Sequence, residues 1–301
     1  MKPNNIPLIS ILLAVKNEEK HLMESLDSII DQSYPHWEVL LVDDHSSDLT
    51  RNIADEYADK YPNIRVIQNT GKGKVAAYNL AYECSFGAFF VFFAGDDVLP
   101  HQSLQERVTP LLDVVDDRPA VSLCRLKTFS DKPKFSGIVT PRNSEEGLYS
   151  GGTMMFNKAF AEKFFSIPAC LGNEDLWAVL HAKYMDVSVY HVLSIGIYYR
   201  IHQGNSLSRM VPFDELNELF HKRYIAFGHF LEKYRMDLPA DSRKKLAGIA
   251  AVETLRYSGS WLSILFAKDI DFEDRMRGVF HATVRLYWLR MRLFSLFSGW
   301  S

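Results

Sequence analysis

Four short apolar runs, each followed by a helical pattern, occupy the first hundred residues and restrict the fold more than any other feature of the sequence. The runs are LISILLAV at 8–15, WEVLLV at 37–42, IRVIQN at 64–69 and FFVFF at 89–93. Strands that alternate with helices of this length form a parallel sheet with right-handed crossovers. Continuous apolar runs also indicate strands that are covered on both faces. The pattern therefore predicts an α/β protein.

Each of these strands ends in a loop that carries polar residues or glycine. The four loops lie at residues 14–17, 43–44, 71–74 and 96–97. In parallel sheets, ligands bind outside the carboxyl ends of the strands, near the point where the strand order reverses. The sequence therefore predicts a ligand site at this edge of the sheet.

Two pairs of adjacent carboxylates are the most distinctive residues of that edge. Asp43 and Asp44 follow the second strand, and Asp96 and Asp97 follow the fourth. Carboxylates that face one crevice repel each other and need a counterion or a donor-rich ligand. A divalent cation, an acid/base pair and a solvated turn all use such residues. A nucleoside diphosphate with its cation supplies both. Its base and ribose donate hydrogen bonds to carboxylates, and its phosphates bind the cation.

The charge balance and the cysteines exclude several classes of protein. Lys and Arg number 34 and Asp and Glu number 37, so the formal charge of −3 gives no basic surface for nucleic acid. Cys84, Cys124 and Cys170 lie far apart without a C-x-x-C pair, which argues against a disulfide scaffold or a thiolate metal site. We expect reduced thiols and a cytoplasmic location. The sequence contains no stretch of about 18 consecutive apolar residues, which a membrane span needs.

Six motifs between residues 8 and 208 together resemble family 2 glycosyltransferases. They are ISILLAVKNEE, EVLLVDDHSSD, NTGKGKVAAYNLA, FFVFFAGDDVLP, GNEDLW and YYRIHQGNSLS, in the order of the family. The resemblance implies a GT-A-like, mostly parallel nucleotide-binding sheet flanked by helices. It divides a catalytic domain at 1–210 into a nucleotide-binding half, 1–100, and an acceptor-binding half, 101–210. A change to long helical patterns predicts a separate helical C-terminal region at 211–301.

The resemblance also implies which residues hold a nucleotide-sugar donor. Asp44 would accept hydrogen bonds from the base, commonly uracil, and the loop around Gly71 would run past the base and ribose. Lys74 is either a phosphate partner or a solvated lysine, and Tyr78 stands where the family often has arginine. The full set of expected donor-binding residues is Ala14, Val15, Lys16, Asn17, Asp44, Gly71, Lys74, Asn79, Asp96, Gly152 and Arg200.

A cation site is implied by the same comparison of motifs. Asp97 would be the direct ligand of Mg²⁺ or Mn²⁺, which clamps the diphosphate. Asp96 would hold the ribose or a metal-bound water, and His202 would complete the metal site. The first acid of the commoner Asp-x-Asp-Asp form is Ala94 here.

Two further acids are implied for the chemical step. Asp175 matches the base that takes the proton of the acceptor hydroxyl in an inverting, in-line displacement. Glu174 would orient the acceptor or brace its loop. Acids in the first turn of a helix also stabilise the helix dipole, so a purely structural interpretation of this pair stays open.

The last residues of the chain combine basic and aromatic side chains. Residues 275–301 contain five arginines and no acids, and Trp288 and Trp300 lie among leucines and phenylalanines. Such a helix either lies on an anionic membrane surface or packs on the catalytic domain. The first alternative would place the protein at the inner face of the cell membrane.

These observations together predict an inverting transferase that moves a single sugar from a nucleotide-diphosphate sugar, most simply a UDP-sugar. We expect the acceptor to be a hydroxyl of a glycan or lipid-linked acceptor in cell-envelope or surface polysaccharide synthesis. One alternative is a nucleotidyltransferase, although the G-x-G-x-R loop of that class is missing. The other is a catalytically inactive GT-A-fold binding protein, which the departures at Lys16, Tyr78 and Ala94 keep open.

Overall fold

The computed structural model describes residues 6–114, 118–142, 145–202 and 212–298 of the chain. It divides into two compact units. The first, which we call the sheet unit, comprises Met1–Ala169 and Asn173–Asn205, and the second, the helical unit, comprises Cys170–Gly172 and Ser206–Ser301. The predicted domain boundary between residues 210 and 211 lies outside the described residues.

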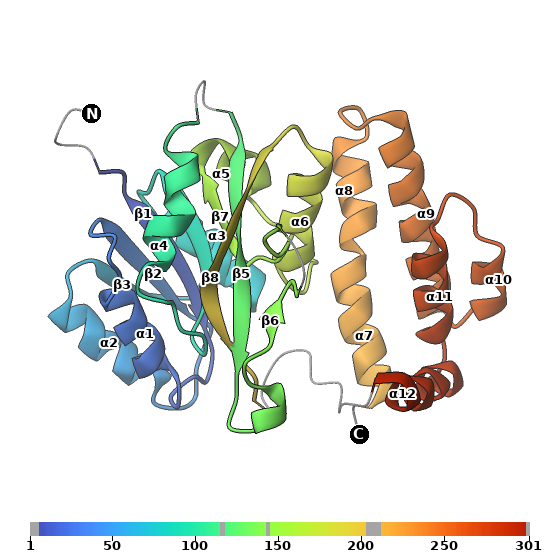
Figure 1. Cartoon of the computed structure of the whole chain (residues 1–301), viewed down its shortest axis with the longest axis horizontal. Coiled ribbons are helices and arrows are strands. Elements are labelled where there is room, and N and C mark those ends of the chain that lie inside the picture. Colours follow the sequence, from blue (N-terminus) through green and yellow to red (C-terminus); the bar gives the residue numbers. More distant parts are fainter. Residues whose placement is uncertain (1–5, 115–117, 143–144, 203–211, 299–301) are drawn as a thin grey trace. The chain divides into compact units, whose positions relative to one another are not determined.

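The sheet unit is built on one eight-stranded sheet (Figure 1). The strand order is β3-β2-β1-β4-β7-β5-β6, and β8 pairs with β5. Strands β3, β2, β1 and β4 run parallel, whereas β7 is antiparallel to both β4 and β5. The strands are β1 (Ile9–Val15), β2 (Trp37–Asp43), β3 (Ile64–Gln68), β4 (Phe89–Ala94), β5 (Ala120–Phe129), β6 (Val139–Thr140), β7 (Met154–Asn157) and β8 (Ser188–Arg200). The predicted α/β class, with a mostly parallel sheet flanked by helices, is confirmed.

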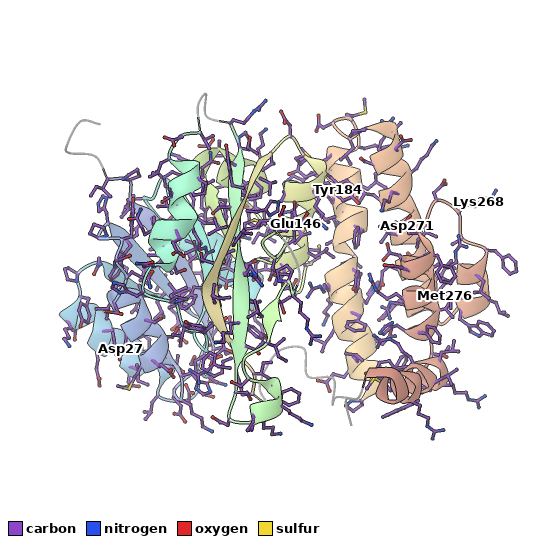
Figure 2. All side chains as sticks on the ribbon, in the orientation of Figure 1. Asp27, Glu146, Tyr184, Lys268, Asp271 and Met276 are labelled. Carbon is purple, nitrogen blue, oxygen red and sulfur yellow. The ribbon has the colours of Figure 1, made fainter. Side chains whose placement is uncertain are left out.

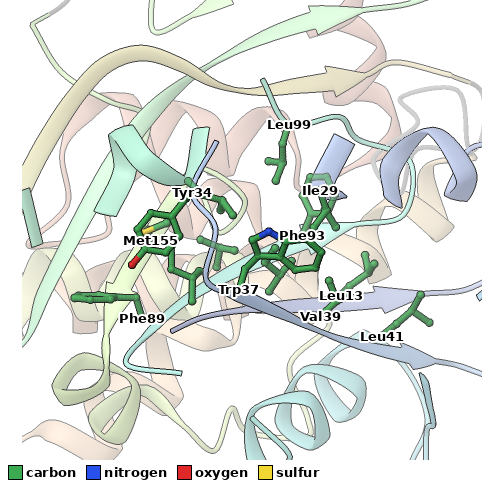
Figure 3. Close-up of a cluster of buried hydrophobic side chains, with 14 of the residues drawn as sticks. Leu13, Ile29, Tyr34, Trp37, Val39, Leu41, Phe89, Phe93, Leu99 and Met155 are labelled. Atoms are coloured by element: carbon green, nitrogen blue, oxygen red, sulfur yellow. The ribbon is translucent and has the colours of Figure 1, made fainter. Parts of the chain in front are cut away.

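Helices cover the sheet on both faces, as the continuous apolar strands require. They are α1 (Leu22–Ile30), α2 (Thr50–Lys60), α3 (Lys74–Glu83), α4 (Ser103–Val108), α5 (Lys158–Phe164) and α6 (Asp175–Tyr184). Alternate residues of β1, such as Ile11 and Leu13, pack in one cluster with Leu26 and Ile29 of α1. Figure 3 shows part of this cluster around Trp37 and Phe93.

The opposite face of the sheet is packed with aromatic rings. The Phe92 ring lies 5.3 Å from that of Phe156 and 5.6 Å from that of Phe164, and Tyr78 meets Phe92 edge to face at 4.8 Å. These rings are at most 1% exposed. Aromatic side chains bury large areas, so this packing holds α3 and α5 rigidly against β4.

The helical unit confirms the predicted helical C-terminal region. Its helices are α7 (Phe213–Tyr224), α8 (Ala226–Tyr234), α9 (Ala240–Tyr257), α10 (Trp261–Leu265), α11 (Phe272–Phe280) and α12 (Val284–Ser298). Helix α9 contacts α7, α8, α10 and α11. A small apolar cluster of Val252, Ile264, Val279 and Ala282 joins α9, α10 and α11. Over the described residues, every helix falls short of the length and apolar character that crossing a membrane demands.

The buried side chains of β2 should stabilise the sheet far more than equivalent exposed side chains. Leu41 is completely buried, whereas Leu49 is 61% exposed. We expect Leu41→Ala to lower the free energy of unfolding by about 2–5 kcal/mol, because it removes apolar contacts and leaves a cavity. The matched control Leu49→Ala should change it by less than about 0.5 kcal/mol. Urea unfolding of both variants tests this, and equal losses would contradict the assigned core.

Candidate active site

Strands β1, β2 and β4 end at the same level of the sheet. Val15 lies opposite Asp43 in the ladder, and Ala14 lies opposite Ala94. The backbone N–H of Asp44 donates to the carbonyl of Val15 at 2.9 Å. The predicted residues that follow these strands are therefore brought to one edge.

Asp44 is held by donors from two loops. Its Oδ1 accepts hydrogen bonds from Asn69 Nδ2 at 2.7 Å and from the backbone N–H of Gly73 at 2.8 Å. Its Oδ2 lies 3.3 Å from Lys16 Nζ. Burial would raise the pKa of Asp44, but these hydrogen bonds outweigh it and lower the pKa below its usual range. Asp44 is therefore an ionised acceptor, and Lys16 is its most exposed partner.

The loops around Asp44 are also bonded to each other. Asn17 has a φ of 56° and its Oδ1 accepts the backbone N–H of Ser47 at 2.8 Å, which ties the β1 exit to the β2 exit. The backbone N–H of Gly71 donates to Asn69 Oδ1 at 3.0 Å. A Cβ at Gly71 would stand 2.8 Å from Ala76 Cβ, so the loop has no room for a side chain there. Val15 is buried, and among the β1 residues of the predicted set only Ala14 is partly exposed.

The two acids after β4 contact the end of β8. Asp97 Oδ1 accepts the backbone N–H of Arg200 at 3.0 Å, and Arg200 Nε donates to the carbonyl of Asp96 at 2.8 Å. Asp96 Oδ2 lies 3.0 Å from His202 Nε2. Arg200 Nη2 also pairs with Glu24 at 2.5 Å, and its guanidinium lies 4.2 Å from the centre of the Phe129 ring. The structure thus joins the predicted residues Asp96, Asp97, Arg200 and His202.

The carboxylate of Asp97 is buried next to the charge of Asp96. Only 6% of the residue is exposed. Burial first, and then the neighbouring charge of Asp96, raise the pKa of Asp97 well above its usual range. The backbone N–H of Arg200 and the charges of Lys74 and Arg200 offset this only in part. Additional positive charge beside Asp97 would therefore stabilise its ionised form.

The residues at this edge fit a divalent cation that a ligand helps to coordinate. Carboxylate oxygens suit Mg²⁺, which proteins commonly bind through one or two carboxylates together with phosphates of the substrate. Within the part of the chain that the structure describes, no group of three or more His, Cys, Asp or Glu side chains is arranged to hold a metal ion. Asp97, with Asp96 and His202 beside it, would thus form one side of a site whose remaining ligands come from a diphosphate.

Glu174 and Asp175 are anchored by glycine and lysine. Asp175 Oδ1 accepts the backbone N–H of Gly151 at 2.5 Å and the hydroxyl of Ser150 at 3.1 Å. Glu174 Oε1 pairs with Lys74 Nζ at 3.0 Å, and Glu174 Oε2 is a buried acceptor without a partner among the described residues. A Cβ at Gly151 would stand 2.9 Å from Asp175 Oδ1, so glycine is required for this approach.

The acids at the start of α6 and the acids after β4 both interact electrostatically with Tyr199 and Lys74. Burial, and then Asp97, Asp96 and Asp175, raise the pKa of Tyr199 to about 12, with Lys74 opposing. Desolvation lowers the pKa of Lys74, but Glu174 and Asp175 outweigh it and raise the value well above normal. Lys74 therefore lies within the electrostatic field of both pairs of acids and stays charged.

Two residues predicted to bind the donor, Asn79 and Gly152, form hydrogen bonds with other parts of the protein. Asn79 Nδ2 donates to the carbonyl of Ile167 at 2.9 Å, and Asn79 Oδ1 accepts the N–H of Ile167 at 2.9 Å. This reciprocal pair holds the chain that precedes α6. The carbonyl of Gly152 accepts Arg107 Nη2 at 3.2 Å. Their roles in binding a ligand stay predictions.

Sequence reasoning missed Glu18 and Arg107. Burial, Asp96 and Asp48 raise the pKa of Glu18 to about 7, and Arg200 partly opposes them. A Cβ at Gly95 would lie 3.1 Å from Glu18 Cγ, so Glu18 packs directly against the loop of Asp96. Its position in the NEE triplet after the first strand was the available signal. Arg107 is 1% exposed on α4, and the sequence contains no signal for its contact with Gly152.

A separate cavity of about 230 Å³ lies in the helical unit. Arg256, Glu253, Arg277 and Asp274 are among its lining residues. These charges pair with one another, Arg256 with Glu253 at 2.7 Å and Arg277 with Asp274 at 2.8 Å. We therefore assign the candidate active site to the strand exits of the sheet unit. There the charge of the buried Asp97 carboxylate is only partly compensated by its neighbours.

Comparison with known sequences gives a family match and several relatives. The description Glycosyl transferase family 2 matches residues 10–170. Glycosyltransferase AglE of Haloferax volcanii is 36% identical over 107 residues, which is 35% of this chain and 35% of the relative. The putative glycosyltransferase EpsE of Bacillus subtilis is 37% identical over 107 residues, 35% of this chain and 38% of the relative.

A third relative is named for its donor and acceptor. It is the UDP-Glc:alpha-D-GlcNAc-diphosphoundecaprenol beta-1,3-glucosyltransferase WfgD of Escherichia coli, 33% identical over 106 residues. The match covers 35% of this chain and 41% of WfgD. The chain thus spans well under half the length of the curated relatives that it matches.

Solved structures share the fold at low sequence identity. TarS 1–349 of S. aureus in complex with UDP-GlcNAc has a TM-score of 0.58 and 18% identity, covering 93% of this chain and 80% of that one. The mannosyltransferase PcManGT of Pyrobaculum calidifontis, in complex with GDP-Man and Mn²⁺, has a TM-score of 0.62 and 15% identity, covering 99% and 83%. Because the family match covers more than half of the chain and the fold agrees with that of these transferases, this chain belongs to glycosyl transferase family 2.

Proposed function

We propose that this glycosyltransferase moves a single sugar from a UDP-sugar to an acceptor hydroxyl, with inversion and with a divalent cation. The observation that carries the proposal is the buried carboxylate of Asp97, whose charge is incompletely compensated by the protein. Asp44 offers an ionised acceptor to the base at the same edge, with Lys16 as the partner that a base would displace. The likeness to TarS, whose structure holds UDP-GlcNAc, supports a UDP-sugar.

The residues of α6 suit the proton transfer. Asp175 would take the proton of the acceptor hydroxyl as the acceptor oxygen bonds to the anomeric carbon. The bond from that carbon to the diphosphate breaks in the same step, and the nucleoside diphosphate leaves from the opposite face. Gly151 N–H and the Ser150 hydroxyl hold one oxygen of Asp175, which fixes its direction. Glu174, braced by Lys74, leaves its buried Oε2 for a hydroxyl of the acceptor.

Asp97, Asp96 and His202 are the residues that would hold Mg²⁺ or Mn²⁺. When bound, the cation would neutralise negative charge that develops on the diphosphate leaving group. The structure of PcManGT with GDP-Man and Mn²⁺ supports a cation in this fold. Arg200 donates through its backbone and side chain to the loop of Asp96 and Asp97, so it would position these acids in addition to any contact with phosphate.

The acceptor that we propose is a lipid-linked glycan of the cell envelope. WfgD is named for an acceptor on diphosphoundecaprenol, and TuaG of Bacillus subtilis is named as a putative teichuronic acid biosynthesis glycosyltransferase. The two matches cover only 35% and 36% of this chain. The linkage and the donor sugar are therefore to be found by screening, for which thermal shift with UDP-, GDP- and dTDP-sugars is suited, because a ligand stabilises the folded state it binds.

Replacing the Asp97 carboxylate should abolish cation-dependent chemistry. We expect Asp97→Asn to lower Mn²⁺-dependent hydrolysis of the donor by about a hundredfold or more, because the amide is a poor ligand for a hard cation. The control Asp59→Asn changes an exposed aspartate of α2 and should leave the rate unchanged. Full activity of Asp97→Asn would contradict the assignment. Donor binding without any hydrolysis or transfer in the wild type would favour the inactive binding protein instead.

A methyl group at Gly151 should disturb the proposed base without disturbing the donor. The new Cβ would stand 2.9 Å from Asp175 Oδ1, so the carboxylate must move. We expect Gly151→Ala to lower kcat by about tenfold to a hundredfold, with the donor KM unchanged. Gly228→Ala is the matched control, because its nearest neighbour would be 4.0 Å away. Steady-state kinetics separate the two constants, and a raised donor KM with normal kcat would argue against Asp175 as the base.

A further inference from the structure

Exposed apolar side chains are concentrated in the helical unit. Half of the large apolar residues that are exposed in the described chain lie between residues 257 and 289, and the others are scattered from 6 to 236. Single exposed apolar residues are ordinary, but a concentration of them marks an interaction surface. Those in the concentrated segment are Tyr257, Trp261, Leu262, Phe266, Phe272, Val284, Trp288 and Leu289.

Helix α12 presents a single exposed stripe. Over residues 284–292, whose side chains the structure describes, the exposed positions are 284, 285, 288, 289 and 292, a spacing that places them on one face of a helix. The opposite face packs inward, because Tyr287 is 4% exposed and Leu286 contacts the small apolar cluster of the helical unit. The stripe therefore combines Val284, Trp288 and Leu289 with the cations Arg285 and Arg292.

Helix α10 lies against the same cluster and also exposes its outer side. Ile264 is completely buried in the cluster that Leu286 contacts, while Leu262 is 57% and Phe266 82% exposed. The turn that begins α10 lies beside the start of α12, since a Cβ at Gly259 would be 3.6 Å from the carbonyl of Ala282. The outer sides of both helices therefore cover one small apolar layer.

The charge of this surface is positive along α12. Residues 281–292 contain Arg285, Arg290 and Arg292 and no acid, whereas Lys268, after α10, is followed directly by Asp269. Figure 2 labels Lys268 on the connection between α10 and α11, at the outer edge of the helical unit. Among the acids near the start of α11, Asp271 pairs with Lys245 at 2.7 Å and Asp274 with Arg277 at 2.8 Å, and Asp269 and Glu273 are exposed. Phe272 lies among these acids, so we leave it outside the surface.

The α10–α12 face is defined by Trp261, Leu262, Phe266, Val284, Arg285, Trp288, Leu289 and Arg292. We propose that the α10–α12 face docks on an anionic lipid surface. Tryptophan rings favour the interface between headgroups and acyl chains, and arginines beside them add attraction to anionic lipids. A protein partner that buried this face would have to supply an anion for Arg285, whereas anionic headgroups supply one directly. The inference deepens the proposed function, because a lipid surface would carry its acceptor, but binding is measured without donor or acceptor.

Sedimentation of the full chain with vesicles tests the proposal. We expect binding to vesicles made of equal parts phosphatidylcholine and phosphatidylglycerol, and much weaker binding to phosphatidylcholine alone. The double variant Phe266→Ser with Trp288→Ser should lower the partition coefficient by about tenfold or more, since it removes two exposed aromatic anchors. Arg285→Gln should lower it by roughly fivefold on the anionic vesicles only. Both changes are at exposed positions, so the variants should fold normally.

The matched control is Phe86→Ser, which replaces a phenylalanine that is 77% exposed on the sheet unit. It should bind vesicles like the wild type. Failure of the wild type to bind anionic vesicles, or equal binding by the double variant, would overturn the proposal. A dimer in light scattering that the double variant abolishes would also overturn it, because the face would then join two copies. The thermal shift caused by UDP and Mn²⁺ should be the same for all variants. Loss of vesicle binding can therefore be distinguished from loss of donor binding.

Discussion

The buried carboxylate of Asp97 is the constraint on which the candidate site depends. Strand β4 is rigidly packed between helices, so it fixes the place where Asp97 emerges, next to the like charge of Asp96. The protein offers Asp97 the backbone N–H of Arg200 and the more distant charges of Lys74 and Arg200, which leave its pKa raised. A folded protein gains no stability from an unmet buried charge. The proposed cation and diphosphate would supply the positive charge and the remaining ligands.

The second pair of acids is connected to the first through Lys74 rather than through the sheet. Lys74 begins α3, directly after the glycine that donates to Asp44, and its side chain reaches Glu174. A change in the 71–74 loop on donor binding would therefore reach the residue next to Asp175. This contact gives a physical route by which an occupied donor site could place the proposed base.

Local patterns predicted the fold, because each apolar run and each helical stripe is determined by neighbours in the sequence. The same held for the strand-exit acids, since parallel strands bring their carboxyl ends to one edge. The sequence alone does not predict side-chain contacts between residues that lie far apart in the chain. The motifs place Lys74 near phosphate, but in the fold it pairs with Glu174. They place Asn79 near the donor, but its side chain bonds to Ile167. Glu18 acquires its raised pKa only through the fold, which packs it against the loop of Asp96.

Electron paramagnetic resonance of Mn²⁺ tests the central claim most directly, because it reports the cation itself and needs neither acceptor nor turnover. The spectrum of free Mn²⁺ should lose intensity when the wild-type protein and UDP are both present, and much less with either one alone, since protein and diphosphate share the ligands. Adding the Asp97→Asn protein to Mn²⁺ and UDP should leave the intensity of the free Mn²⁺ spectrum essentially unchanged. Equal loss of signal with the wild type and Asp97→Asn would contradict the account.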